Sequence, residues 1–200
     1  STFETIRQRA HEIALVMVEP VRSRNPNNQP VEFLKELRRI TEELDIPLLM
    51  DEMVTGFRSH PGGVQALWGV RADLATYGKV VGGGFPIGVV AGSKKYMDAL
   101  DGGQWTYGDD SQPEADMTWF AGTFVRHPPA LAAAKAVLLR LKEEGPALQD
   151  KLADRVKRFS DELNDHFRAT GTPIYLEYFS SFFVLKFSEF VEYSNLLFYH

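Results

Sequence analysis

Two short apolar runs, each followed by an acidic residue, flank a segment with helical periodicity, and this order constrains the fold most strongly. The first run, Ile13 to Val18, precedes Glu19, and the second, Ile46 to Met50, precedes Asp51. Between the runs, apolar residues recur at helical spacing, at Phe33, Leu34, Leu37, Ile40 and Leu44. Short continuous apolar runs are typical of buried parallel strands. Because strand, helix and strand in succession form a βαβ unit, the sequence predicts an α/β protein.

The next part of the chain continues this pattern and then becomes irregular. Residues 72–77 are predicted to form a further strand that leads into Lys79, and residues 87–91 form another apolar run. Residues 94–100 are predicted to be helical. The stretch 101–118 is rich in Gly, Asp and aromatic residues and has no clear period. A loop of this length inside a compact domain is more often functional than idle.

Two helices and a pair of strand-like segments are predicted in the last third of the chain. The prolines at positions 128 and 129 are placed to begin the first helix. The second helix is predicted to follow Gly145 and Pro146, to carry apolar residues from Leu148 to Phe167, and to end at Gly171 and Pro173. Aromatic-rich, strand-like segments follow it as far as Phe187. Because the composition changes at the two prolines, we predict a sheet domain over residues 1–127 and a smaller domain over residues 128–200.

Composition excludes several classes of function. The net charge of −5 is spread along the chain without the basic stripe that nucleic-acid phosphates require. The absence of cysteine excludes disulfides, iron–sulfur clusters and thiol chemistry. The five histidines lack metal-ligand spacing, so no metal site is predicted. The apolar runs are too short to span a bilayer, so neither a membrane nor a nucleic acid is a predicted partner.

The two ends of the sequence favour a piece of a longer cytoplasmic polypeptide. The N-terminal residues lack the apolar core of a signal peptide. The C-terminal stretch, Asn195 to His200, is apolar and would have to pack against something. A C-terminal helix that docks on its own domain is the alternative explanation.

Asp51 and Lys79 are the two candidates for chemistry. Asp51 stands at the carboxyl end of a predicted strand, where α/β sheets place ligand-binding residues, although such a residue can also cap a turn or a helix. Lys79 lies between a predicted strand and the triplet Gly82 to Gly84. A lysine held among buried segments must pair or lose its proton, which makes the amine nucleophilic; a solvated surface lysine is the alternative. The glycines let the backbone approach a bound group, and their spacing matches neither nucleotide-binding fingerprint.

Three motifs, in this order, resemble class III aminotransferases, the class that includes glutamate-1-semialdehyde aminomutase: Val18-Glu19-Pro20, Asp51 to Arg58 (DEMVTGFR) and Tyr77 to Gly88 (YGKVVGGGFPIG). The chain is most similar to the aminotransferase domains of hybrid polyketide/non-ribosomal-peptide synthases. The stretches that carry this closer similarity are Arg22 to Pro26, Met97 to Gly103 and Phe120 to Phe124. The resemblance implies a PLP-dependent transferase of fold type I. Such a chain would contain part of a large domain with a mostly parallel sheet, then part of a small α+β domain.

The resemblance also implies a role for each of five residues around pyridoxal 5′-phosphate (PLP). Lys79 would bind the cofactor covalently and then move the proton between the substrate carbon and the cofactor. Asp51 would pair with the pyridinium nitrogen, whose positive charge withdraws electrons from the reacting carbon. Met53 would lie against the ring face, where relatives carry Val or Ile. Glu19 would lie on the side of the phenolic oxygen. Thr123 would bind the cofactor phosphate of a neighbouring subunit, which implies a homodimer; a turn or cap residue is the alternative.

The implied reaction transfers an amino group from an amino acid to a β-keto acyl thioester held on an acyl carrier domain. One departure concerns Arg24, because many ω-aminotransferases of this class carry a Glu five residues after the Glu of Glu-Pro. The way in which those enzymes switch between binding the amino donor and binding the amino acceptor is therefore not expected here. The N-terminal portion that forms the family's phosphate cup and stacking aromatic is absent, as is the end of the small domain. The chain alone is therefore expected to bind PLP poorly.

Two other functions remain open from the sequence. A free-standing aminomutase of the same class would share Lys79 and Asp51 but move an amino group within one molecule. A non-catalytic scaffolding or docking segment of a large synthase would not depend on Lys79.

Overall fold

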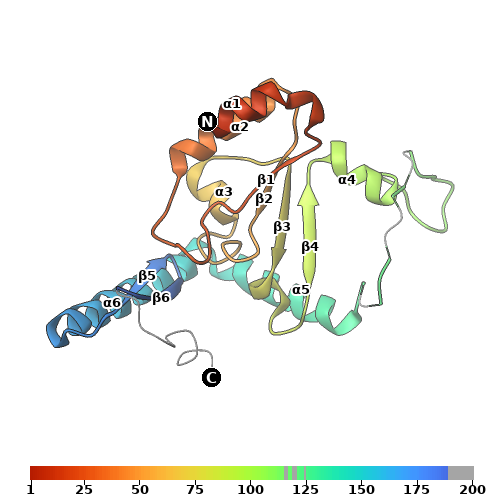
Figure 1. Cartoon of the computed structure of the whole chain (residues 1–200). Helices are drawn as coiled ribbons and strands as arrows, with labels where there is room; N and C mark the ends of the chain where they lie inside the picture. The colour runs from red at the N-terminus through yellow and green to blue at the C-terminus, as the bar shows by residue number, and fades with distance from the viewer. Residues whose placement is uncertain (115–116, 119–120, 124, 189–200) are drawn as a thin grey trace.

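A four-stranded sheet forms the centre of the molecule (Figure 1). The computed structural model describes residues 1–114, 117–118, 121–123 and 125–188. The strands are β1 (Val16–Val18), β2 (Leu48–Asp51), β3 (Leu74–Gly78) and β4 (Gly88–Gly92), and they lie in the order β1-β2-β3-β4. The first three are parallel, and β4 is antiparallel to β3. The predicted α/β architecture with a mostly parallel sheet is therefore confirmed.

One face of the sheet is covered by α2 (Val31–Glu43), with α1 (Thr2–Gln8) beside it and a short 3₁₀ turn, η1 (Ala10–Glu12), leading to β1 (Figure 1). The α2 helix is amphipathic, and its buried side chains pack on alternate residues of β2. The resulting core consists of Ile6, Leu34, Leu37, Ile40, Ile46, Leu48, Met50 and Val70. Since side chains alternate along a strand, Leu49 and Asp51 belong to the opposite face of β2.

The connection between β3 and β4 is short and glycine-rich. It begins with the 3₁₀ turn η2 (Lys79–Gly82) and continues through Gly83, whose φ of 58° lies in the left-handed region. A connection this short cannot carry the crossover that a parallel pair needs, so β4 returns antiparallel to β3. Beyond β4, α4 (Lys94–Asp101) ends where the stretch predicted to lack regular structure begins. The described residues after α4, up to residue 118, form neither helix nor strand.

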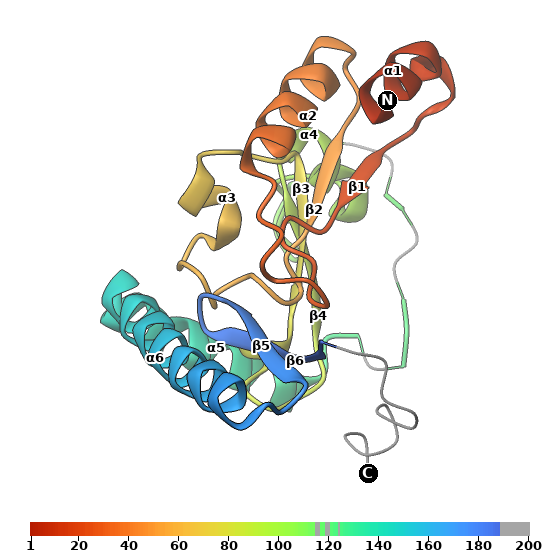
Figure 2. The same cartoon turned by 60° about the vertical axis from the view of Figure 1, so that its left-hand side comes forward.

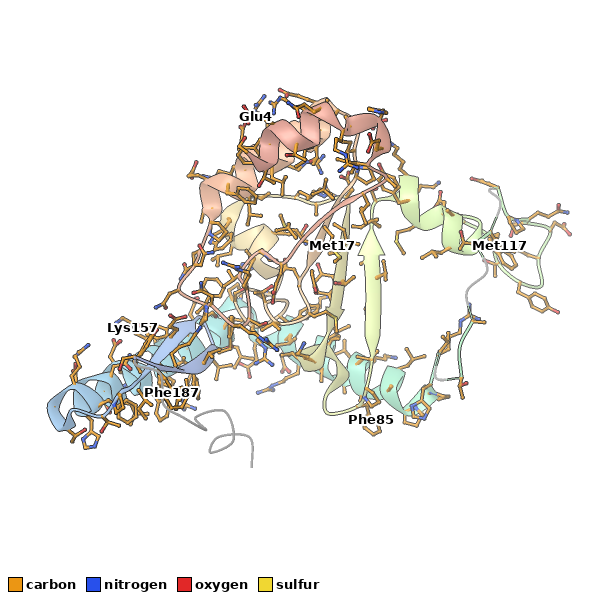
Figure 3. The ribbon with its side chains drawn as sticks, in the orientation of Figure 1. Glu4, Met17, Phe85, Met117, Lys157 and Phe187 are labelled. Carbon is orange, nitrogen blue, oxygen red and sulfur yellow. The ribbon has the colours of Figure 1, made fainter. Side chains whose placement is uncertain are left out.

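The last part of the chain forms an arm beside the sheet (Figure 2). It contains α5 (Pro128–Glu144), α6 (Pro146–Thr170) and the hairpin of β5 (Ile174–Phe179) and β6 (Phe182–Phe187). Figure 3 marks Lys157 and Phe187 in this arm, and Met17 in the sheet. The hairpin packs on α6, whereas α5 packs on η2. The boundary predicted near residue 128 stays a prediction, and residues 189–200 of the predicted small domain lie outside the described residues.

Within the described ranges, three hydrogen bonds join this arm to the loop that follows β2. The Gln149 side chain donates to the Phe57 carbonyl at 3.1 Å. The hydroxyl groups of Ser180 and Ser181 donate to the Arg58 carbonyl at 3.0 and 3.3 Å. The loop between β2 and α3 (Gly63–Trp68) is therefore held by both parts of the molecule.

The structure differs from the sequence-based expectation in three places. The α1 and α3 helices were not predicted. The first strand covers only the end of the apolar run Ile13 to Val18, and Met17 is 67% exposed rather than buried. Val16 and Val18 pack on the core beneath α2, whereas Met17 points to the opposite face of β1, which is an edge strand among the described strands. All described helices are too short or too polar to cross a bilayer.

Candidate active site

The carboxyl ends of three parallel strands bring Glu19, Asp51 and Lys79 to one edge of the sheet. Val18 at the end of β1 pairs with Met50, and Asp51 at the end of β2 pairs with Thr76. Glu19 follows β1 directly, and Lys79 follows β3 directly. In parallel sheets this edge is where ligands bind. Asp51 and Lys79, which are far apart in sequence, therefore reach the same edge from adjacent strands.

The Asp51 carboxylate is oriented by two hydrogen bonds to one of its oxygens. Its Oδ1 accepts from the Met53 backbone N–H at 3.0 Å and from the Thr76 hydroxyl at 3.0 Å. Among the described residues, none donates to its Oδ2. The carboxylate is thus fixed by the strand that leads to Lys79, and one oxygen is available for an outside donor.

Lys79 has an unusual backbone conformation for a residue with a side chain. Its φ is 47°, in the left-handed region that L-residues rarely adopt. Such a conformation costs about 1–3 kcal/mol and is concentrated at functional sites. The side chain is exposed, so the expectation of a lysine held among buried segments is wrong for this chain, and no ion pair joins its amine to any described residue. The amine is therefore available to an electrophile at the strand ends.

Met53 lies over Gly78, the residue before Lys79. A Cβ atom on Gly78 would stand 3.0 Å from the Met53 Sδ and closer still to its methyl group. The flexible thioether fills the space that a larger residue 78 would need. Met53 is partly buried, and its backbone N–H also orients Asp51. The structure thus joins Met53 to Asp51 by a hydrogen bond and places its side chain beside Gly78, which precedes Lys79.

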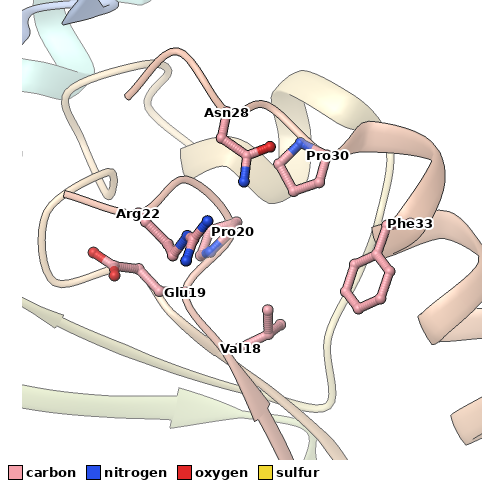
Figure 4. A pocket seen from close by; sticks show the side chains of 7 residues that line it. All are labelled: Val18, Glu19, Pro20, Arg22, Asn28, Pro30 and Phe33. Carbon is pink, nitrogen blue, oxygen red and sulfur yellow. The ribbon is translucent and has the colours of Figure 1, made fainter. Parts of the chain in front are cut away.

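Glu19 is held by the loop that follows it, because its Oε1 accepts from the Ser23 backbone N–H at 2.9 Å. It borders a hollow of about 410 Å³ whose lining is drawn in Figure 4, a volume in the range of small-ligand sites. The lining residues are Val18, Glu19, Pro20, Arg22, Asn28, Pro30 and Phe33. In Figure 4 the Glu19 carboxylate points away from the Phe33 ring. The hollow therefore combines an apolar wall with the polar side chains of Arg22 and Asn28.

Thr123 is exposed in a turn ahead of α5, and no hydrogen bond joins it to the strand-end residues in the part of the chain that the structure describes. The structure does not bring it into the group formed by Glu19, Asp51, Met53 and Lys79. Its neighbours Phe120 and Phe124, which belong to the motif that singled it out, lie outside the described residues.

Sequence reasoning missed two residues of this region. Thr76 binds Asp51, and the strand prediction over residues 72–77 contained the signal, since Thr76 lies opposite Asp51 when the strands pair. Glu52 is fully buried, which its charged side chain did not suggest. The described residues contain no group of three or more His, Cys, Asp or Glu side chains that could hold a metal.

Comparison with known proteins decides the family. Residues 1–172 match the family model described as aminotransferase class III.

The chain belongs to the class III aminotransferases.

Curated relatives in this class agree with the family match. Glutamate-1-semialdehyde 2,1-aminomutase of Pyrobaculum calidifontis is 36% identical over 187 residues, which are 93% of this chain and 39% of the relative. The enzyme of the same name from Hyperthermus butylicus is 42% identical over 136 residues, which are 68% of this chain and 29% of the relative. The chain therefore spans well under half the length of these relatives.

Solved structures confirm the fold. An omega-transaminase from Sphaerobacter thermophilus has a TM-score of 0.77 and 32% identity, with 95% of this chain and 41% of that one covered. A β-phenylalanine aminotransferase from Variovorax paradoxus has a TM-score of 0.74 and 27% identity, with 93% and 40% covered. The predicted family resemblance and the predicted fold type I, present in part, are both confirmed.

The strand-end residues fit PLP, the cofactor of this family. A pyridine N–H needs a carboxylate oxygen without another donor, and Asp51 Oδ2 meets that need among the described residues. An aldehyde carbon needs an amine without a competing ion pair, and the Lys79 amine forms none with the residues that the structure describes. A flat ring needs an apolar side chain beside the lysine, and Met53 lies there over Gly78. The donor set of this chain thus matches the cofactor at its nitrogen, its aldehyde and one ring face.

Proposed function

We propose that the protein is a PLP-dependent aminotransferase and that this chain supplies its Lys79 amine and its Asp51 carboxylate. The observation that carries the proposal is that Asp51 and Lys79 reach the same edge of the sheet from adjacent strands. Asp51 ends β2 with one oxygen held by Thr76 of β3, and Lys79 directly follows β3 with an amine that forms no ion pair with any described residue. When bound, PLP supplies a protonated pyridine ring that accepts electrons from the substrate carbon.

Each residue then has a separate task. Asp51, held by Thr76 and the Met53 N–H, keeps a negative charge at the ring nitrogen and so keeps that nitrogen protonated. Lys79 holds the cofactor until the amino donor arrives and then accepts and returns a proton as a general base and acid. Met53 excludes water from one side of the lysine. Glu19, which directly follows the neighbouring strand β1, adds a third polar side chain at this edge of the sheet.

The proposed acceptor is a β-keto acyl thioester carried on an acyl carrier domain. An amino acid loses its amino group and becomes a 2-oxo acid, while the acceptor's ketone oxygen is replaced by that amino group, so no outside oxidant or reductant is needed. The support is the similarity of Arg22 to Pro26 to synthase domains. A homodimer with Thr123 reaching the partner's cofactor phosphate and a cytoplasmic location are parts of the same proposal.

A glutamate-1-semialdehyde-type aminomutase is the second candidate, favoured by the names of the curated relatives. The two candidates use the same Lys79 and Asp51 but differ in substrate. Product analysis with glutamate 1-semialdehyde alone, and with an amino acid plus a β-keto acyl pantetheine thioester, separates them. A product only in the first assay selects the aminomutase, and a β-amino acyl product only in the second selects the carrier-bound substrate.

The decisive test of the PLP assignment is borohydride reduction of the full-length protein that carries this chain, after incubation with PLP. Mass-spectrometric mapping is expected to find a pyridoxyl group on Lys79. Lys79→Arg should lose the adduct, whereas Lys94→Arg, a matched exposed lysine on α4, should keep it. A folded full-length protein without an adduct on Lys79 would overturn the assignment and favour the scaffolding alternative.

A further inference from the structure

Glu52 is a fully buried carboxylate directly after Asp51, and the mechanism above does not use it. Burial of a charged group requires hydrogen-bond partners, because desolvation alone is costly. Glu52 has them: its Oε2 accepts from the Thr55 hydroxyl at 2.8 Å and from the Val64 N–H at 2.9 Å. Its Oε1 accepts from the Gln65 N–H at 3.1 Å and the Gln65 amide at 3.3 Å. Each oxygen thus accepts two hydrogen bonds, and all but the one from the Thr55 hydroxyl come from residues of α3.

The first turn of α3 lies directly against the Glu52 carboxylate. Gly63 begins the helix with a φ of 69°, and a Cβ there would stand 2.6 Å from the Glu52 Cδ. No residue other than glycine fits this position without moving the carboxylate. Since α3 has no side-chain cap at Gly62, Glu52 satisfies the free N–H groups of its first turn from a distant strand.

The same network reaches the strand that leads to Lys79. The Gln65 amide, bound to Glu52, also donates to the Tyr77 hydroxyl at 3.4 Å, and its oxygen accepts from the Ala72 N–H at 2.8 Å. The Glu52 backbone N–H donates to the Thr76 carbonyl at 3.0 Å, which extends the pairing of β2 with β3. Burial raises the pKa of Tyr77, and the nearby Glu52 charge adds to the effect, so this phenol stays a neutral partner.

We infer that Glu52 is a positioning residue that sets the orientation of Asp51 toward the cofactor. Successive residues in extended chain point to opposite sides, so Glu52 is anchored on α3 while Asp51 faces the opposite side, with Thr76. With Glu52 fixed, the backbone at Met53 is fixed too, and its N–H holds Asp51 Oδ1 at 3.0 Å. The inference rests on the proposed function, because it assigns Asp51 to the pyridine nitrogen. Supporting residues behind a site commonly decide whether its geometry is precise.

The experiment compares Glu52→Gln with Arg38→Met in the full-length protein. Glutamine keeps the shape of Glu52, but its NH₂ group replaces one accepting oxygen and faces hydrogen-bond donors that it cannot accept from. Arg38 forms a half-buried 2.6 Å ion pair with Asp73 at the other end of β2 and β3, so its loss is a matched structural defect. The measurements are the Kd of PLP, the circular dichroism of the bound cofactor and the melting temperature without PLP.

Glu52→Gln is expected to weaken PLP binding about tenfold or more and to change the cofactor dichroism, as loss of an outer-shell partner does elsewhere. Arg38→Met is expected to lower the melting temperature while leaving both cofactor readouts unchanged. Where Glu52→Gln does not fold, Thr55→Val removes a single donor and is expected to give a smaller change of the same kind. Wild-type affinity and dichroism in a folded Glu52→Gln or Thr55→Val protein would overturn the inference.

These results are distinguishable from failure of the proposed function. If the wild-type protein forms no pyridoxyl adduct at Lys79, the proposed function fails first. If wild type and Glu52→Gln both form the adduct with equal affinity and equal dichroism, the proposed function stands and only the role of Glu52 is rejected.

Discussion

The Met53 side chain occupies the space beside Gly78 in which any larger residue 78 would place its Cβ atom. Gly78→Ala would therefore displace Met53, and its Cβ would also stand 3.0 Å from the Ile87 carbonyl, which is backbone and cannot move cheaply. We expect the variant to bind PLP more weakly and to melt at a lower temperature. Adding Met53→Val, which shortens the side chain, should recover part of the affinity. A double variant no better than Gly78→Ala would show that Met53 is not the obstacle.

Thr76→Val removes the hydroxyl that donates to Asp51 Oδ1 at 3.0 Å and keeps the side-chain shape. A hydrogen bond to a charged group contributes about 1.5–3 kcal/mol, so we expect the Kd of PLP to rise by about tenfold or more. Titration of the apoprotein with PLP measures the change. Thr170→Val removes an exposed hydroxyl that donates to the His166 carbonyl and serves as the control, with no change expected.

Asp51→Asn keeps the contact with Thr76 but removes the negative charge at the pyridine nitrogen. Turnover should fall by about 100-fold or more, because electrostatic stabilisation of the transition state is often the largest single contribution to catalysis. Steady-state rates with an amino donor measure it. Asp45→Asn removes an exposed partner of Lys95 and should retain wild-type turnover. Equal rates for the two variants would remove Asp51 from the mechanism.

Asp73 should make stability depend on acid pH. Burial alone would raise the pKa of Asp73, but the Leu48 N–H and the Arg38 guanidinium outweigh it and hold the pKa below the ordinary 3.8. Its stabilisation is therefore complete above the unfolded-state pKa and disappears as the pH falls through the lower folded-state pKa.

Asp73→Asn should lower the melting temperature at neutral pH, with a loss of roughly 1–3 kcal/mol. The difference between the variant and wild type should shrink as the pH falls below 3.8. Melting curves from pH 2 to 7 check this expectation. A gap that stays constant through the acid range would mean that the Asp73 charge does not stabilise the fold.

Sequence periodicity predicted most of the elements because local pattern and burial agree there. The α2 helix has its apolar stripe at the predicted positions, and α5 begins at the prolines that predicted it. The α1 helix was missed although Ser1 and Glu4 form a capping box, a signal present in the sequence. The antiparallel direction of β4 could also have been predicted from its short connection to β3.

The parts that could not be predicted depend on tertiary contacts. The six-residue α3 helix begins with a glycine, and its free N–H groups are satisfied by Glu52, which lies far from it in sequence. The burial of Glu52 has no local signal, because charged side chains are rarely inside. The left-handed backbone at Lys79 likewise follows from the turn between β3 and β4 and not from the lysine itself. The roles of Lys79, Asp51, Met53, Glu19 and Thr123 in the cofactor site remain predictions.

The network behind Asp51 has a consequence for how such proteins diversify. Every partner named for Asp51 and Glu52 lies between residues 51 and 79, and Lys79 closes that segment. The residues that orient Asp51 therefore lie in one uninterrupted stretch of the chain. Exchanging that stretch between relatives as a single piece should preserve their contacts, whereas a crossover between Glu52 and Gln65 would separate a carboxylate from the donors that fit it. Substrate preference can then be recombined around the stretch without disturbing it.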